Sequence, residues 1–160
     1  MNHNQRFALS LVNNLQSSFN CQTWCYCPGG RNSPIVTVLT QDRSYSFFNE
    51  QSAAFFAVGR IKRDNLPVAV TTTSGTAVAQ LLPAVIESFY MRLPLILVTA
   101  DRPISYRGTG APQSINQSYI FSEYAQFIAL DSRSSLSGLS WNKDSPLHLN
   151  ISFDEPLIEK

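Results

Sequence analysis

The spacing of hydrophobic residues predicts several helices along this chain. From Phe7 to Phe19, apolar side chains recur every three or four positions, as on one buried face of a helix. The segments Glu50–Arg63 and Ala77–Met91 have the same periodicity. Proline lacks the amide hydrogen that continues a helix, so we expect the second of these helices to kink or to restart near Pro83.

Shorter runs of apolar and β-branched residues lie between the helical segments, as is typical of strands in a parallel sheet. The six runs are Cys21–Cys27, Ser44–Phe48, Pro67–Thr72, Pro94–Thr99, Tyr124–Leu130 and Leu147–Ile151. The fourth run is almost entirely apolar, which predicts burial on both faces. The Ser-rich stretch Asp131–Lys143 is expected to be loop or short helix. Strands that alternate with helices predict an α/β fold, a three-layer sandwich with a mostly parallel sheet flanked by helices on both faces.

The composition supports one folded domain. The chain has 160 residues, of which 44% are hydrophobic and 14% are charged, so a core can be buried and disorder is not expected. A net charge of +1 gives no basic surface for nucleic acid or for an anionic membrane. The longest apolar run is too short to cross a bilayer, and the N-terminal segment lacks a secretory signal. We expect a cytoplasmic protein with no nucleic-acid partner and no membrane span.

Three cysteines form the pattern C-x3-C-x-C at Cys21, Cys25 and Cys27. Because these positions are all odd, a continuous strand would carry the three thiols on one face. A metal site would need further ligands, yet the chain has only two histidines and no second cysteine pair. We therefore expect no metal site, and buried free thiols of a protein in the reducing cytosol.

Ligands of parallel α/β sheets bind outside the carboxyl ends of the strands, so the motifs that follow each expected strand are candidate sites. The first motif is P-G-G-R-N-S-P, in which Arg31 could bind a carboxylate or a phosphate, or could be a solvated side chain of a plain turn. In the same motif, Ser33 is expected to be the N-cap and Pro34 the first residue of a short helix over Ile35–Leu39.

The second and third motifs are N-E-Q-S and T-S-G-T. Glu50 opens a helix, where its charge could simply favour the helix dipole. It also lies between two Phe pairs, and apolar surroundings favour the neutral form of a carboxyl group, which suits proton transfer. The stretch Thr73–Thr76 could be a helix cap or an anion-binding nest, but it is not a P-loop.

The fourth motif is A-D-R-P, followed by R-G-T-G-A-P-Q. Asp101 and Arg102 could pair with each other, which contributes little stability at an exposed position. However, Arg31, Arg102 and Arg107 would all lie at the same edge of the sheet. Three guanidinium groups there indicate a substrate with several carboxylates.

Read together, these motifs resemble the N-terminal pyrimidine-binding (PYR) domain of the SEPHCHC synthase family, thiamine-diphosphate-dependent enzymes of menaquinone biosynthesis. The matching stretches are CPGGRNSPI, FFNEQSAAFFAVGRIKRDNLPVAV, TTTSGTAVAQLLPAVIESFY, RLPLILVTADRP, RGTGAPQSINQ and PLHLNISFDEPL, in the family's order. The resemblance implies the thiamine-diphosphate-binding fold, with residues 1–160 forming a single PYR-type domain. We expect the central and diphosphate-binding domains of the family to be absent from this chain.

The resemblance also implies roles for individual residues. Glu50 matches the glutamate that hydrogen-bonds the aminopyrimidine ring of the cofactor and favours the imino tautomer that takes up the thiazolium proton. Thr73, Ser74 and Gly75 match a loop near the pyrimidine. The positions that face substrate carboxylates and intermediates are matched by Arg31, Arg102 and Gln113. Arg107 is added to this substrate group on the physical argument alone.

The implied reaction decarboxylates 2-oxoglutarate and adds the succinyl unit to isochorismate. Thiamine diphosphate and Mg²⁺ would need the diphosphate-binding domain of a partner subunit, whose G-D-G motif this chain lacks, so the chain alone is expected to be inactive. The full enzyme would be a dimer or tetramer. Gly30 and Pro112 depart from the family's usual Ser and Asn, and Asn49 and Gln51 depart from its D-E-R-S. Two alternatives therefore stay open: another 2-oxo acid decarboxylase or carboligase, and a non-catalytic interaction remnant.

Overall fold

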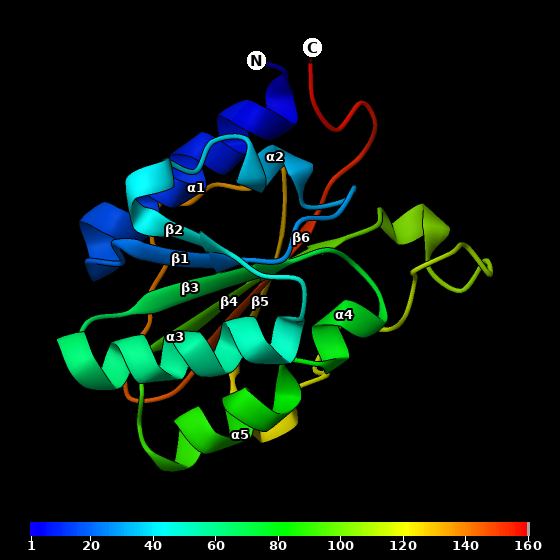
Figure 1. Ribbon diagram of the computed structural model, residues 1–160. Helices are drawn as coiled ribbons and strands as arrows, with labels where there is room; N and C mark the ends of the chain where they lie inside the picture. The colour runs from blue at the N-terminus through cyan, green and yellow to red at the C-terminus, as the bar shows by residue number, and fades with distance from the viewer. Residues whose placement is uncertain (160) are drawn as a thin grey trace.

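The computed structural model describes residues 1–159, which form one parallel sheet covered by helices (Figure 1). The strands are β1 (Thr23–Tyr26), β2 (Ser44–Ser46), β3 (Val68–Thr72), β4 (Leu95–Asp101), β5 (Gln126–Asp131) and β6 (Leu147–Ser152). Their order is β2-β1-β3-β4-β6-β5, and every neighbouring pair is parallel. The α/β three-layer fold predicted from the sequence is confirmed.

Helices cover both faces of this sheet. In Figure 1, α1 (His3–Phe19) and α2 (Ser33–Val36) lie on one face, and α3 (Glu50–Asp64) and α5 (Leu82–Tyr90) lie on the other, together with the short α4 (Thr76–Ala79). Single 3-10 turns occur at Gln41–Arg43, Ile104–Tyr106 and Ser122–Tyr124. Each long helix turns its apolar face to the sheet, as the spacing of apolar residues predicts.

The sheet separates two hydrophobic cores, and β4 contributes to both. Ile96, Val98 and Ala100 pack in the core beneath α1, whereas Leu95 and Leu97 pack in the core beneath α3 and α5. Every residue of β4 is buried, which confirms the expectation drawn from its apolar sequence.

Polar caps fix where the two longest helices begin and end. Asn2 and Gln5 form a capping box at the start of α1, and the Asn49 side chain accepts a hydrogen bond from the Ser52 amide at the start of α3. Asn20 and Asn65 end these helices in the left-handed conformation, with φ of 61° and 52°. The boundaries therefore come from local sequence signals.

Two of the expected helices differ from the structure. The N-cap of α2 is Asn32 rather than Ser33, and its side chain is already engaged in the preceding turn. The helix expected over Ala77–Met91 is two helices, α4 and α5, and Pro83 lies in the first turn of α5. Proline is tolerated there because the first amides of a helix have no intrahelical acceptor.

The Ser-rich stretch between β5 and β6 contains no helix in the described structure and crosses the α1 face as a series of turns. Trp141 anchors it: its indole nitrogen donates to the Ser145 carbonyl at 2.7 Å, and its ring packs edge-on against Phe19 at 5.5 Å. A buried aromatic anchor of this kind fixes a long loop without regular backbone hydrogen bonds.

The three cysteines do not share one face, contrary to the sequence-based expectation. Cys21 packs in the core beneath α1, whereas Cys25 and Cys27 pack in the core beneath α3. Cys21 precedes β1, so the strand alternation does not reach it. All three thiols are free and buried, and burial raises the pKa of each to about 12.

Two further properties follow from the described part of the chain. Within residues 1–159, His, Cys, Asp and Glu side chains nowhere gather in a group of three or more that could hold a metal ion. The same residues include no helix that is long and apolar enough to cross a membrane.

The order of the crossovers explains where a crevice opens. The connections that leave β2, β3 and β4 cross on the α3 face, whereas those that leave β1 and β5 cross on the α1 face. On the α3 face the chain moves along the sheet towards β5, and on the α1 face it moves towards β2. All crossovers therefore have the same hand. Since the connections after β1 and β3 depart on opposite faces, a crevice forms between these neighbouring strands at their carboxyl ends.

Candidate functional site

A polar cleft of about 460 Å³ lies at this crevice. The loops after β1, β2 and β3 supply its walls, and the segment after β4 closes one side. Its lining residues are Pro28, Gly29, Gly30, Asn49, Glu50, Thr73, Thr76, Ala77, Gln80 and Gln113. Of the residues proposed from the sequence, the structure brings Glu50, Thr73 and Gln113 together in this cleft.

Glu50 is the acidic group of the cleft. It is the first residue of α3, held there by the Asn49 cap, and its side chain is half-buried. The Thr72 hydroxyl, at the end of β3, donates to Glu50 Oε1 at a long 3.4 Å. The Cys27 thiol stays protonated beside it, because burial, and then the negative charge of Glu50, raise its pKa to about 12. Glu50 therefore accepts from Thr72 and supplies the one carboxyl group among the residues that line the cleft.

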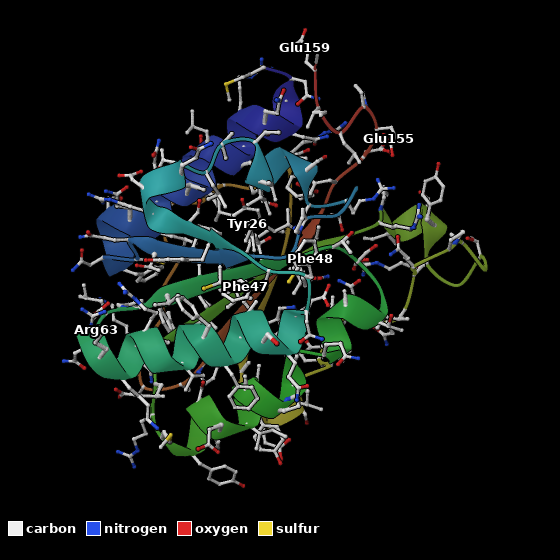
Figure 2. The ribbon with its side chains drawn as sticks, viewed as in Figure 1. Tyr26, Phe47, Phe48, Arg63, Glu155 and Glu159 are labelled. Atoms are coloured by element: carbon white, nitrogen blue, oxygen red, sulfur yellow. The ribbon has the colours of Figure 1, made fainter. Side chains whose placement is uncertain are left out.

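The apolar enclosure of Glu50 expected from the flanking Phe pairs is wrong for the described chain. Phe48 is fully exposed and Phe55 is also exposed. Phe56 turns away from the cleft to pack against Tyr45 and Phe47, at ring distances of 5.0 and 5.2 Å. Phe47 and Phe48 follow β2 on the segment that leads into α3 (Figure 2). The edge position of β2 explains this exposure, because no further strand covers that side.

The loop after β3 divides its residues between the cleft and the chain. Thr73 lines the cleft, and its buried hydroxyl oxygen has no hydrogen-bond partner among residues 1–159. Ser74 instead donates from its hydroxyl to the Gln113 carbonyl at 2.8 Å. Gly75 has a φ of +85°, and a Cβ on it would lie 2.9 Å from the Cα of Gln113. Only glycine permits this close approach, so Ser74 and Gly75 join two loops while Thr73 borders the cleft.

The loop after β1 is fitted closely to Thr73. A Cβ on Gly29 would lie 2.6 Å from the Thr73 Cβ, whereas a Cβ on Gly30 would meet no atom within 4 Å. Asn32 holds this turn together, because its buried side chain accepts from the Gly29 amide at 2.9 Å and donates to the Cys27 carbonyl at 3.0 Å. Asparagine in a glycine-rich turn is a recognisable signal for such a bond, although the sequence analysis gave Asn32 no role.

Arg31 lies beside the C-terminal segment rather than in the cleft. Its Nη1 donates to the Phe153 carbonyl at 3.1 Å and lies 3.2 Å from the Glu155 carboxylate. Glu155 lies on the segment that follows β6 (Figure 2). A ligand carboxylate would therefore have to displace Glu155, which is itself exposed, to reach this guanidinium.

The other two arginines lie on the segment after β4 and have separate contacts. Arg102 donates from Nε to the Pro112 carbonyl at 2.9 Å, which holds the loop that carries Gln113. Arg107 forms an ion pair with buried Asp101, with Nη2 and Oδ2 2.9 Å apart. Arg107 also lines a second hollow of about 470 Å³, between the ends of β4, β5 and β6.

Two buried residues that the sequence analysis missed connect these loops. The Gln117 side chain accepts from the Gly75 amide at 2.9 Å and donates to Asn150 Oδ1 at 2.7 Å. Asn150 in turn donates to Asp101 Oδ2 at 2.8 Å. Because Gly75 and Asn150 are far apart in the chain, only the tertiary fold reveals these contacts.

Comparison with known proteins shows the family of this chain. Residues 8–120, more than half of the chain, match the family described as "Thiamine pyrophosphate enzyme, N-terminal TPP binding domain". The chain belongs to this family. The cleft at the switch point of the sheet, with Glu50 at the N-terminus of α3, therefore lies in a domain of this family.

Several curated relatives carry the name 2-succinyl-5-enolpyruvyl-6-hydroxy-3-cyclohexene-1-carboxylate synthase. The chain is 56% identical to that of Bdellovibrio bacteriovorus over 83% of its own length, and 46% identical to that of Akkermansia muciniphila over 98%. The relative from Halobacterium salinarum is 36% identical, also over 98% of the chain. The chain spans only 26% to 30% of the length of these relatives.

Proposed function

We propose that this chain supplies the pyrimidine side of a thiamine-diphosphate-dependent active site that decarboxylates 2-oxoglutarate and adds the succinyl unit to isochorismate. The proposal rests chiefly on one observation: Glu50 stands in an open cleft at the switch point of a domain that belongs to the thiamine pyrophosphate enzymes. The similarity to relatives named for this synthase supports the choice of substrates.

The residues of the cleft fit the aminopyrimidine end of the cofactor. A carboxylate at Glu50 can accept a hydrogen bond from a protonated ring nitrogen, and Thr73 lines the cleft nearby, with a buried hydroxyl that has no partner among residues 1–159. The glycines after β1 leave room for a flat ring, because Gly30 faces open space. These observations support binding of the pyrimidine between the loops after β1, β2 and β3.

When bound, thiamine diphosphate supplies a carbon nucleophile for the 2-oxo acid. Glu50 would hold the pyrimidine end of the cofactor by a hydrogen bond to its ring nitrogen, and would so support the proton transfer that the cofactor's chemistry needs. The protonated Cys27 beside Glu50 adds no competing negative charge. Proton transfer by a positioned group accelerates a reaction by about 10²- to 10⁴-fold.

Substrate carboxylates would meet the guanidinium groups and the amide at the same edge of the sheet. Arg102 and Gln113 lie on the segment that closes the cleft, and Arg31 can exchange Glu155 for a ligand. Arg107 is the weakest candidate, because Asp101 already neutralises its charge.

The remaining parts of the site would come from another domain. Mg²⁺ prefers several oxygen ligands beside phosphates, and the cleft of the described chain offers a single carboxylate. We therefore propose that the diphosphate and Mg²⁺ bind to the diphosphate-binding domain of a partner subunit, in a dimer or tetramer. The free, buried cysteines fit a reducing compartment, in line with a cytoplasmic enzyme.

The test is complementation. We would mix the chain with the part of the Bdellovibrio relative that lies outside the matched region, and add thiamine diphosphate, Mg²⁺, 2-oxoglutarate and isochorismate. We expect release of carbon dioxide and formation of the succinylated product, and a loss of about 10²-fold or more in kcat for Glu50→Gln. Glu87→Gln, at an exposed position of α5, is the matched control and should keep full activity.

Three outcomes would contradict the proposal. A folded complex that binds the cofactor but makes no product rejects the reaction. Turnover of pyruvate without use of isochorismate favours another decarboxylase or carboligase. Unchanged activity of the Glu50→Gln complex indicates that the chain contributes an interaction surface instead of catalysis.

A further inference from the structure

A chain of buried hydrogen bonds runs from the loop after β3, beside the cleft, to the carboxyl ends of β4 and β6. It begins at the Gly75 amide, continues through the side chains of Gln117 and Asn150, and reaches Asp101 at the end of β4. These three side chains are almost completely buried. Polar groups buried to this extent are costly unless they are paired, so their pairing is strongly constrained.

Gln117 is placed so that its orientation is fixed. Its amide nitrogen donates to Asn150 Oδ1 and to the Ala100 carbonyl at 3.2 Å, so its oxygen is directed to the Gly75 amide. If the amide were inverted, its oxygen would face two acceptors, Asn150 Oδ1 and the Ala100 carbonyl, and its nitrogen would face the Gly75 N–H. The geometry therefore requires a side chain that donates at one end and accepts at the other.

Asn150 is the branch point of the network. Its oxygen accepts from Gln117 and from the Thr99 hydroxyl at 2.8 Å, and its nitrogen donates to Asp101. Thr99 and Asn150 are direct partners in the register of β4 and β6. Through Asn150, Gln117 is thus tied to β4 and β6, two paired strands that are buried along almost their whole length.

The consequence concerns the loop that borders the cleft. Gly75 N–H is held by Gln117, and the preceding Ser74 hydroxyl is held by the Gln113 carbonyl. We propose that Gln117 and Asn150 are positioning residues that fix the Thr73–Thr76 loop against the segment carrying Gln113, and so set the width of the cleft opposite Glu50. The link to catalysis rests on the proposed function, whereas the link to loop geometry does not.

The test measures amide hydrogen exchange of Gly75 by NMR on this chain. Gln117→Met keeps the size of the side chain but removes both hydrogen-bonding ends. We expect the protection of the Gly75 amide, relative to the natural chain, to fall about tenfold, which corresponds to one lost hydrogen bond. Val98, in the middle of β4, should keep most of its protection, because its backbone bonds are untouched.

A second variant separates hydrogen bonding from packing. In Gln117→Glu, an ionised carboxylate can still accept from Gly75 but opposes the oxygen of Asn150. Protonation restores a donor, so the protection of Gly75 should recover as the pH falls. The groups that titrate or carry charge nearby are Asp101, Arg107 and His148, and they are common to both chains, so each pH is compared with the natural chain. Gln16→Glu, on the exposed side of α1, is the matched control.

These results decide the proposal without any measurement of turnover, so its failure is distinguishable from failure of the proposed reaction. If the Gly75 amide of Gln117→Met exchanges as slowly as in the natural chain, the positioning role is overturned. The same follows from a loss of protection that is equal at Gly75 and Val98, since that outcome assigns Gln117 to general stability. A Gln117→Glu variant whose Gly75 protection ignores pH also overturns it.

Discussion

Two clusters of polar residues at the carboxyl edge of the sheet contrast in how they use their hydrogen-bonding groups. In the cleft between β1 and β3, Glu50 and Thr73 line the open space, and the buried Thr73 hydroxyl has no partner within the described chain. Between β4 and β6, Gln117, Asn150 and Asp101 are buried and bonded to one another or to the backbone. The first cluster has unused capacity for a ligand, whereas the second is part of the framework.

The contrast shows that polar residues at a strand end can have two different roles. A polar residue that the chain already satisfies contributes to stability and to the placement of loops. A polar residue that faces a cavity keeps its bonding groups available for a ligand. The two clusters meet at Gly75, which Gln117 holds from the framework side while Thr73 borders the cleft.

The strongest test of this contrast removes the charge in the framework. Asp101→Asn leaves the Arg107 guanidinium without its counter-charge and places an amide nitrogen against hydrogen-bond donors. We expect a loss of about 3 kcal/mol in the free energy of unfolding, measured by urea denaturation. The comparison with Glu50→Gln, which removes a charge in the open cleft, should show a much smaller loss.

Glu155→Gln is the control for the ion pair itself. It breaks the pair between Glu155 and Arg31. The Glu155 side chain is 63% exposed, and exposed ion pairs contribute about 0 to 1 kcal/mol to stability. An Asp101→Asn chain that is as stable as the Glu155→Gln chain would show that burial does not distinguish the two regions.

Two adjacent glycines allow the close packing of the cleft wall to be tested. Gly29→Ala should lower the free energy of unfolding by about 1 to 3 kcal/mol, because its Cβ would lie 2.6 Å from that of Thr73. Gly30→Ala, with no atom within 4 Å, should change it by less than about 0.5 kcal/mol. Thermal unfolding of both variants measures the difference, and equal stabilities would contradict the packing described here.

The last prediction concerns a change of stability with pH. Burial lowers the pKa of His148 to about 3, while in the unfolded chain it keeps an ordinary value near 6.5. Between these values the unfolded chain binds one more proton, so stability is complete above pH 6.5 and falls as the pH decreases towards 3. The contribution of His148 to this fall approaches about 1.4 kcal/mol per pH unit.

His148→Gln should therefore flatten the pH dependence between about pH 6 and pH 4, measured by denaturant unfolding at each pH. His3→Gln is the control, because His3 is exposed. Identical pH profiles for the natural chain and for His148→Gln would show that the folded chain can bury His148 in its protonated form at no cost in stability.

Much of the fold could be predicted from the sequence because its signals are local. Asparagine caps bound α1 and α3, apolar spacing identifies their buried faces, and Pro83 marks the start of α5. The position of Glu50 after a strand and at the first turn of a helix was predicted for the same reason. These features depend on neighbours within a few residues.

The rest depends on contacts that the sequence alone does not reveal. Gln117 and Asn150 carry no local signal, because their partners are far away in the sequence. Asn150 meets its partners on β4 through the pairing of β4 with β6, and Gln117 meets Gly75 through the tertiary fold. The expected cover of Phe side chains over Glu50 fails because β2 is an edge strand, and edge position is a property of the whole sheet. The roles proposed for Arg31, Arg102 and Arg107 stay predictions, although their contacts within the chain are now defined.

The buried thiols give this fold built-in chemical probes. The thiolate is the form that reacts with alkylating reagents, and a pKa of about 12 leaves almost none of it in the folded state. Labelling at neutral pH then reports the moments when a layer opens. Labelling of Cys21 reports local opening of the α1 layer, and labelling of Cys25 and Cys27 reports local opening of the α3 layer. The local opening of each side of the sheet can thus be measured separately in one chain.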